Sequence, residues 1–595
     1  MSSASVVIVS YHTGWVLYAA IASALQQEGL ANIVVVDNGN PPDVIAKLQQ
    51  QALMEPRLVI VSGHGNIGFA AACNLGSERA TGEYLLLLNP DCLLPPDALA
   101  TLMREMSALP NTMLAGVHLV NPDGSEQRGG RRALLTPGSA LGEMLGLRKL
   151  NFNRTPMPQG THDVQAISGA CMCIRKADYD VLGGMDEKFF LHVEDLDLCM
   201  RVARAGKRIV CVPMVKVAHL LSTSGETGRG KIEWHKAKSF IYYFEKHFAD
   251  SMLPGVLQIL GGGIWLRYFL RRYFGAQKTG NVIARRKLRV LAGSLTTRQH
   301  AGSLAGKTIL VTGATSQVGV EVVRHLLAAG IAVLAVSRHA PLPFYHPLLK
   351  WLQKDLTAAD FSLDGYLADA AIHCAPQWHL AKVVPVLAAS EIKRIVAIGS
   401  TSVFSKARSR NGIEKDIVDK HTRAEQEIPR VCGELGIAWT ILRPTMIYGI
   451  GIDKNITSLA RFIRKFGFVP VYPPAVGRRQ PVHAEDIAIG ALQAMHSASA
   501  ADKMYNLSGG EILTYREMIL RLFAVMKISP KIVGTTLLPS ILGLAGLLLR
   551  KPLMNRDVAY RMNEDMVFFH DDAERDFGYH PREFLSGGIA DLGEG

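Results

Sequence analysis

The chain has 595 residues, is 48% hydrophobic and 20% charged, and carries a formal net charge of +13. A chain of this length exceeds what one hydrophobic core supports, so we expect roughly two to four domains. Its eight cysteines form no CxxC pair and no regular spacing, which argues against a zinc site or a disulfide framework and favours a reducing compartment.

The first residues predict the start of a nucleotide-binding domain. Residues 6–10 and 33–36 are apolar runs typical of buried strands, with a helical stretch between them. The second run ends in Asp37, and an acid at the end of the second strand of a βαβ unit is a nucleotide-binding arrangement. No basic segment precedes the first run, so we interpret it as a strand and not as a secretory signal.

A block rich in glycine and asparagine follows a third expected strand at residues 58–61. In GHGNIGFAAACNLG, Gly68 permits close approach of the backbone, and Asn66 and Asn74 supply amides. These side chains are candidates for binding a substrate.

A polar triplet, Asn89-Pro90-Asp91, ends the next apolar run, EYLLLL. Such a continuous run is typical of a buried parallel strand. A capped turn would explain the shape of the triplet but not its position after a hydrophobic strand.

The segment FFLHVEDLDLCMR, residues 189–201, predicts a helix that begins with acids. Apolar residues from Leu196 to Ala203 recur at helical spacing, and Gly206 is expected to end the helix. Acids in a first turn also complement the helix dipole, but that does not explain two adjacent acids, Glu194 and Asp195, where the helix meets a loop. We interpret them as a general base and its neighbour.

These motifs together resemble the family 2 glycosyltransferases, especially the rhamnosyltransferase-like branch, over about residues 6–219. The resemblance implies a GT-A-type α/β fold and inverting transfer in which Asp195, beside Glu194, takes the proton of the acceptor hydroxyl. It implies that the nucleotide-sugar donor lies against Asp37, Asn66, Gly68, Asn74 and Asn89. It also implies that Mg²⁺ or Mn²⁺ is held by Asp91, where relatives carry Asp-x-Asp, and by His219.

A basic segment follows. Residues 251–320 contain no Asp or Glu, and arginines such as Arg267, Arg271 and Arg272 alternate there with apolar and aromatic residues. Neither this segment nor residues 537–549 reach the length of a spanning helix. Basic and aromatic residues together suit an anionic membrane surface, although an amphipathic helix packed on its own domain is the alternative. No nucleic-acid recognition motif accompanies the charge, so we expect no nucleic acid as a partner.

A second nucleotide-binding start begins at Lys307. A strand leads into the loop from Gly313 through Ser316 to Gly319 and then into a helix, which suits the pyrophosphate of a dinucleotide. Arg338 follows the next strand where an acid would hold a ribose hydroxyl, which favours NADP over NAD.

The remaining motifs (KDL, AIHCA, VAIGSTSVF, WTILRPTMIYG and RQPVHAEDIA) resemble the extended short-chain dehydrogenase/reductase family of epimerases and dehydratases. The resemblance implies a Rossmann domain with Asp355 and Arg423 at the cofactor and Ser400 in catalysis. The family's Tyr-x-x-x-Lys pair is missing: no tyrosine lies between residues 403 and 441, and by spacing Asp419 and Arg423 occupy the two places. Chemistry then uses another group, such as His421, or the domain binds the nucleotide without turnover.

We therefore expect a transferase domain over residues 1–248, a basic amphipathic linker over 249–303 and a Rossmann domain over 304–595. The expected function is transfer of rhamnose or a similar sugar to a lipid-linked or saccharide acceptor, in the synthesis of surface polysaccharide such as O-antigen. The second half is either an epimerase or reductase of the nucleotide sugar or a non-catalytic nucleotide-binding scaffold. The expected location is the cytoplasm, at the inner face of the cytoplasmic membrane. The apolar residues 537–552 form a lid, a homodimer face or a membrane contact.

Overall fold

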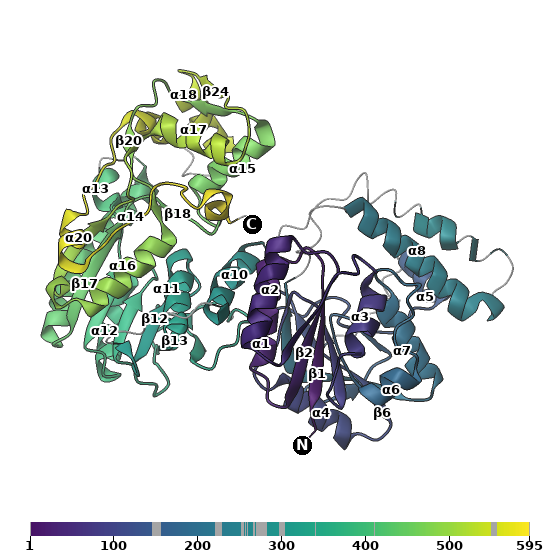
Figure 1. Cartoon of the computed structure of the whole chain (residues 1–595). Coiled ribbons are helices and arrows are strands. Elements are labelled where there is room, and N and C mark those ends of the chain that lie inside the picture. Colours follow the sequence, from purple (N-terminus) through teal and green to yellow (C-terminus); the bar gives the residue numbers. More distant parts are fainter. Residues whose placement is uncertain are drawn as a thin grey trace. The chain divides into compact units, whose positions relative to one another are not determined.

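The computed structural model describes residues 2–144, 156–220, 229–251, 255, 257–258, 260–265, 268, 282–296, 304–339, 341–407, 409, 411–548 and 556–593. The chain forms two compact units (Figure 1). The first comprises Met1–Arg285 and Leu342–Pro347, and the second comprises Arg286–Pro341 and Leu348–Gly595. About half of the expected basic linker, including Arg267, Arg271 and Arg272, lies outside the described residues, whereas its residues 282–296 form helix α10 (Val282–Thr296).

The first unit is built on a nine-stranded mixed sheet in the order β3-β2-β1-β4-β10-β6-β11-β5, with β8 paired to β11. The strands are β1 (Ala4–Ser10), β2 (Leu30–Asp37), β3 (Leu58–Val61), β4 (Tyr84–Leu88), β5 (Cys92–Leu93), β6 (Thr112–Val120), β8 (His162–Asp163), β10 (Cys171–Arg175) and β11 (Arg208–His219). The three apolar runs predicted as strands near the N-terminus, and the run before Asn89, are β1 to β4.

Strands β1 to β4 are parallel, because β1 pairs in that sense with both β2 and β4, and β2 with β3. Their connections are α1 (Trp15–Leu25), α2 (Pro42–Met54) and α3 (Phe69–Ser77). The carboxyl ends of parallel strands share one edge of a sheet, so Asp37 at the end of β2 and Asn89 after β4 lie at that edge. Antiparallel β10 then separates β4 from β6.

The strand side chains pack into hydrophobic cores on both faces of this sheet. Helix α4 (Ala98–Ala108) contributes to one core, while α3 and α7 (Glu194–Arg204) contribute to the other, together with α8 (Arg229–Phe248). The prediction of a helix beginning with the acids is confirmed, and Gly206 follows its end with a positive φ of 67°. The buried face of α7 holds the first turn of this helix against the sheet.

The second unit has a seven-stranded parallel sheet in the order β14-β13-β12-β15-β16-β17-β22. The strands are β12 (Thr308–Thr312), β13 (Ala332–Ser337), β14 (Leu349–Gln353), β15 (Ala370–His373), β16 (Arg394–Ile398), β17 (Ala438–Pro444) and β22 (Lys503–Leu507). Helices α12 (Leu380–Ala389) and α14 (Gly412–Glu434) share one core with the sheet. This doubly wound arrangement is the predicted Rossmann fold.

A smaller core lies in the C-terminal part of the second unit. It gathers α15 (Ile456–Phe466), α17 (Tyr515–Val525) and α18 (Leu538–Leu548), with β19 (Val469–Val471) paired to β24 (Ile532–Gly534). In the described part of the chain, no helix is both long and apolar enough to cross a membrane.

Candidate functional site

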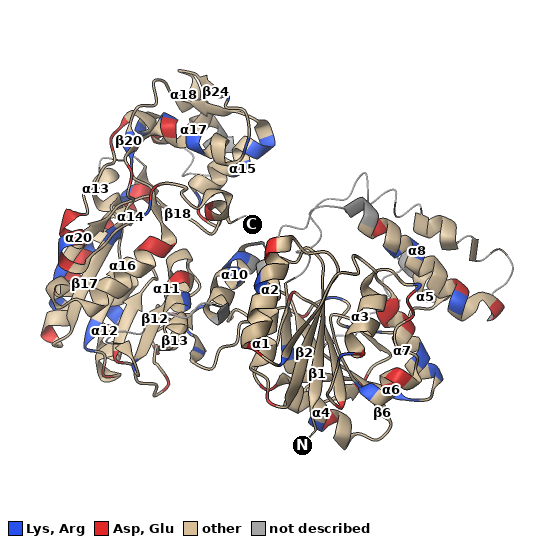
Figure 2. Ribbon diagram, viewed as in Figure 1, with Lys and Arg blue, Asp and Glu red and all other residues tan. Residues whose placement is uncertain are grey.

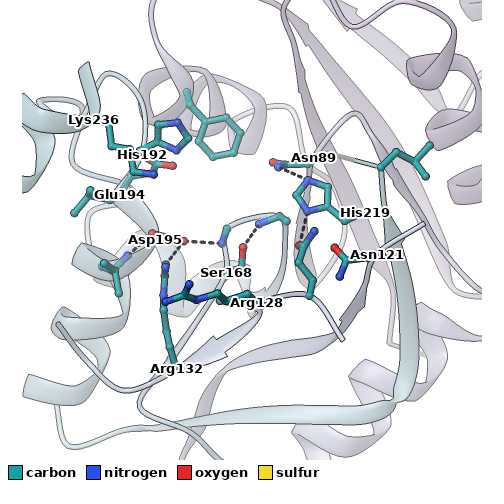
Figure 3. A pocket seen from close by; sticks show the side chains of 18 of the residues that line it. Asn89, Asn121, Arg128, Arg132, Ser168, His192, Glu194, Asp195, His219 and Lys236 are labelled. Atoms are coloured by element: carbon teal, nitrogen blue, oxygen red, sulfur yellow. Dashed lines mark hydrogen bonds and ion pairs between the residues drawn. The ribbon is translucent and has the colours of Figure 1, made fainter. Parts of the chain in front are cut away.

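A cavity of about 890 Å³ opens at the carboxyl edge of the first sheet. Its walls come from the end of β4, the loop over residues 121–132, the turn over 168–170, the start of α7, the end of β11 and α8. Figure 3 shows Glu194, Asp195 and Arg132 on one side of this space and Asn89 and His219 on the other.

Asp195 is held by three donors. Its Oδ2 atom accepts hydrogen bonds from Arg132 Nη2 at 2.7 Å and from the Gly169 N–H at 3.0 Å, and its Oδ1 atom accepts from the Leu196 N–H at 2.8 Å. All three suit a carboxylate. The predicted base is therefore fixed in orientation within the cavity.

The backbone just before the two acids is strained. His192 and Val193 have φ angles of 67° and 76°, and Val193 is buried. A left-handed conformation is a genuine outlier for a β-branched residue, and such conformations cluster at functional sites. This turn aims Glu194 and Asp195 into the cavity from the first turn of α7.

Glu194 differs from its neighbour. Its side chain is buried, and among the described residues its Oε2 atom has no hydrogen-bond partner. Burial, and next the charge of Asp195, raise its pKa to about 8. Burial likewise lowers the pKa of His192 to about 4. The neutral forms of both groups are thus favoured near pH 7.

On the opposite side of the cavity, the lining residue His219 lies against the buried Asp91. The Asp91 Oδ1 atom lies 3.1 Å from His219 Nε2, and the Asn89 Nδ2 atom lies 3.5 Å from the same nitrogen. The other imidazole nitrogen, Nδ1, lies 2.7 Å from Gln127 Oε1, which holds the ring in place.

The donor set fits a divalent cation that keeps several waters and binds substrate phosphates. Asp91, Cys92 and His219 place one ligand atom each within 4.8 Å of one another. The Cys92 thiol donates a hydrogen bond to the Ala170 carbonyl at 3.4 Å, which leaves one carboxylate oxygen and one imidazole nitrogen. Mg²⁺ and Mn²⁺ favour oxygen ligands and are commonly bound through one or two carboxylates.

The other residues predicted to bind the nucleotide-sugar donor have hydrogen-bond partners within the protein. Asp37 Oδ1 accepts from the Asn40 N–H at 2.8 Å. The Asn74 side-chain amide donates to the Met185 carbonyl and accepts from the Met185 N–H and the Tyr179 hydroxyl. It therefore fastens the loop before α7 to α3. Asn66 is exposed and accepts from the Gly68 N–H.

Gly68 shows why that block needs a glycine. Its φ is 90°, and a Cβ atom there would lie 2.8 Å from the Phe190 carbonyl oxygen and 2.9 Å from its ring. The predicted close approach is therefore a contact with the segment that leads into α7. Donor binding by this block stays a prediction.

In the second unit, the predicted glycine loop joins β12 to α11 (Gln317–Ala328). Gly313 has a φ of 66°, and a Cβ there would collide with the backbone at Ala375. Ser316 caps α11 by accepting from the Gly319 N–H at 3.0 Å. A tight loop at a helix N-terminus is a cradle for a pyrophosphate, so these residues fit a dinucleotide.

The remaining predicted cofactor residues lie near the ends of two strands. Arg338 follows β13 and Asp355 follows β14, both exposed. Asp355 accepts from the Thr357 N–H and hydroxyl, and these bonds lower its pKa. Selection of NADP by Arg338 stays a prediction.

Of the catalytic candidates in this unit, Ser400 follows β16, and Asp419, His421 and Arg423 lie on α14. Ser400 Oγ accepts from the Ser402 N–H at 3.1 Å. Asp419 and Arg423 are exposed on α14, while His421 is buried with its Nδ1 2.9 Å from Gln377 Oε1. Burial lowers the pKa of His421.

Sequence reasoning missed the loop that carries Arg132 and Gln127, which contact Asp195 and His219. The only signal was the pair of adjacent arginines after two glycines, in QRGGRR. Arg128 and Lys236 also line the cavity and were not singled out.

Residues 5–183 match the family model "Glycosyl transferase family 2", and residues 309–508 match "NAD dependent epimerase/dehydratase family". The N-acetylglucosaminyl-diphospho-decaprenol L-rhamnosyltransferase of Mycobacterium tuberculosis is 26% identical over 312 residues, covering 48% of this chain and 97% of the relative. The rhamnosyltransferase WbbL of Escherichia coli K12 is 25% identical, covering 32% of this chain and 72% of the relative.

A UDP-glucose 4-epimerase of Vibrio cholerae is 23% identical over 246 residues, covering 36% of this chain and 75% of the relative. Both resemblances expected from the motifs are confirmed by these matches. The chain thus joins a family 2 glycosyltransferase domain to a domain of the NAD dependent epimerase/dehydratase family.

Proposed function

We propose that the first unit transfers rhamnose or a similar sugar, with inversion, from a nucleotide-sugar donor to a lipid-linked or saccharide acceptor in surface polysaccharide synthesis. The observation that carries the proposal is the cavity with a fixed carboxylate, Asp195, on one side and His219, which contacts Asp91 behind it, on the other. The relative from Mycobacterium tuberculosis, whose name describes an acceptor on diphospho-decaprenol, supports a lipid-linked acceptor.

In the proposed reaction, Asp195 accepts the proton of the acceptor hydroxyl as that oxygen bonds to the anomeric carbon and the bond to the donor diphosphate breaks. Arg132 and the Gly169 N–H orient the carboxylate through Oδ2. Asp91 and His219 would hold Mg²⁺ or Mn²⁺, which supplies positive charge for the departing nucleoside diphosphate. Gln127 keeps the His219 ring turned toward Asp91.

For the second unit we propose NAD(P) binding with an atypical or absent redox step. By its spacing in the sequence, Asp419 occupies the place of the family's tyrosine. It is exposed on α14 and has no phenolic proton. Conversion of a nucleotide sugar by this unit is the competing function. NAD(P)-dependent conversion that disappears in Ser400→Ala would favour it, whereas tight binding of NADPH without conversion would favour the scaffold.

The test of the transferase is release of nucleoside diphosphate from dTDP-, UDP- and GDP-linked sugars with Mg²⁺ or Mn²⁺. Asp195→Asn should lower the rate by about 10²–10⁴-fold, the usual contribution of a general base. Asp91→Ala should also abolish the response to the cation. Asp43→Asn, an exposed acid on α2, is the matched control. Release that is unchanged in Asp195→Asn would mean that the base is misassigned.

The transferase is proposed to work at the inner face of the cytoplasmic membrane, because a lipid-linked acceptor is presented there. Sedimentation of the chain with membranes, reversed by salt, would support this location. Recovery of all activity away from membranes at low salt would contradict it.

A further inference from the structure

An exposed apolar stripe runs along α18 in the second unit. Leu537, Ile541 and Leu544 are 66%, 52% and 59% exposed. Leu537 directly precedes the helix and accepts a hydrogen bond from the Ile541 N–H, so the spacing of the three residues places them along one side of α18. Isolated exposed leucines are ordinary, but three large aliphatic side chains at least half exposed on one face call for a partner. We name these three residues the α18 face.

The opposite side of α18 is fastened to its own unit. Leu538 is buried, and Leu542 packs against the C-terminal core. Across Gly543 the helix meets the side chain of Arg556. The helix is therefore docked by one side, and the exposure of the α18 face is not a sign of a loose helix.

The surroundings of the α18 face are basic. Residues 518–556 contain no Asp or Glu, yet they include Lys527, Lys531 and Arg556, besides Arg521, which pairs with Glu511. The pairing of β24 with β19 brings this segment next to the end of α15, which carries Arg464 and Lys465. Residues 454–484 also lack acids. In the ribbon of Figure 2, α15 carries Lys and Arg, α17 carries residues of both signs, and the described parts of α18 and β24 carry neither.

An apolar helix face is commonly covered by a second copy of the chain or by a membrane, and the nearby basic residues distinguish these two cases. A twofold interface between copies would bring the same basic elements from both chains together, because such an interface is self-complementary, and like charges would oppose it. An anionic bilayer offers apolar chains for the leucines and phosphates for the cations.

We propose that the α18 face is a lipid-binding surface that seats the second unit on an anionic bilayer. Leu537, Ile541 and Leu544 enter the boundary between headgroups and acyl chains, while Lys527 and Lys531 approach lipid phosphates. This binding is independent of the transfer reaction and of residues 249–303.

Insertion is read directly from Ile541→Cys labelled with an environment-sensitive fluorophore in the otherwise unchanged full chain. The probe is a vesicle of phosphatidylcholine mixed with phosphatidylglycerol in equal parts, and a vesicle of phosphatidylcholine alone is the comparison. We expect a blue shift and a gain in intensity with the anionic vesicle. The same label at Met54→Cys, 84% exposed at the end of α2, should not respond.

Partitioning gives the second measurement. The triple variant Leu537→Ser, Ile541→Ser, Leu544→Ser should bind anionic vesicles about tenfold more weakly or worse, because buried apolar area sets the strength of interfacial binding. Lys531→Gln should weaken binding about fivefold, the effect of one cation near an anionic surface. Leu53→Ser with Met54→Ser, on two exposed side chains of α2, should change nothing.

A label at position 541 that keeps its spectrum while the chain sediments with vesicles would overturn the proposal. So would a chain that does not bind the anionic vesicles at all. Light scattering adds a third outcome: a triple variant that changes the oligomeric mass but not the partitioning would assign the α18 face to a second copy. Nucleoside-diphosphate release from the nucleotide-sugar donor, measured with a soluble acceptor, should be equal in all variants, which separates this test from that of the transferase.

Discussion

Glu194 links the electrostatics of the cavity to the stability of the first unit. Its pKa in the folded protein is about 8, raised from 4.5 by burial and then by the charge of Asp195. At a pH between 4.5 and about 8, Glu194 has lost its proton in the unfolded chain but retains it in the folded chain. The free energy of unfolding therefore falls as the pH rises through this interval.

The size of the effect follows from the interval. At 1.36 kcal/mol for each pH unit, an interval from 4.5 to about 8 corresponds to about 5 kcal/mol. This contribution is fully present below pH 4.5 and is lost above about pH 8. Glu194→Gln is uncharged at every pH and should escape the loss.

The assay is calorimetric unfolding of the full chain, with Glu194→Gln compared with the parent across pH. Between about pH 5.5 and 7.5, the free energy of unfolding of the first unit should fall by about 3 kcal/mol more in the parent than in Glu194→Gln. Glu78→Gln, an exposed acid after α3, should give a difference that does not depend on pH. A flat difference for Glu194→Gln, or one that favours the parent at high pH, would refute the reasoning.

Two further substitutions test packing and charge. Gly68→Ala should lower the stability of the first unit by about 2–4 kcal/mol, because the new methyl group strains the left-handed backbone and contacts Phe190. The control is Gly183→Ala, where φ is 76° and no atom lies within 4 Å of the added Cβ, so this variant should show the backbone strain alone. Arg582→Met should cost about 3–5 kcal/mol in thermal or urea unfolding because it leaves Asp486, a buried carboxylate, without its 2.8 Å partner. Arg478→Met, at an exposed ion pair, should cost about 0–1 kcal/mol, and equal losses would contradict the burial argument.

The elements at the site were predictable because local patterns specify them. The apolar spacing of Leu196 and its neighbours predicted α7, and the continuous run before Asn89 predicted β4. Gly313 to Gly319 predicted the loop into α11, since only a strand, a tight turn and a helix satisfy that order. Each signal lies within a few residues of the element it predicts.

The contacts around Asp195 and His219 were not predictable in this way. Arg132 lies 63 positions before Asp195, and Gln127 lies 92 positions before His219. Such pairs leave no period in the sequence, because they form only when the sheet brings its loops to one edge. The burial of Glu194 is equally a property of the packed cavity, so its pKa was beyond sequence reasoning.

The two adjacent acids have environments that separate their roles. Glu194 faces a buried space where its neutral form is favoured, while Asp195 meets a guanidinium and two N–H groups that suit a carboxylate. With Glu194 neutral, no second carboxylate charge stands beside Asp195. A substitution that kept Glu194 charged would set a second carboxylate beside Asp195. In the proposed transfer reaction, the strained turn at His192 and Val193 therefore serves both by burying one acid and by aiming the other.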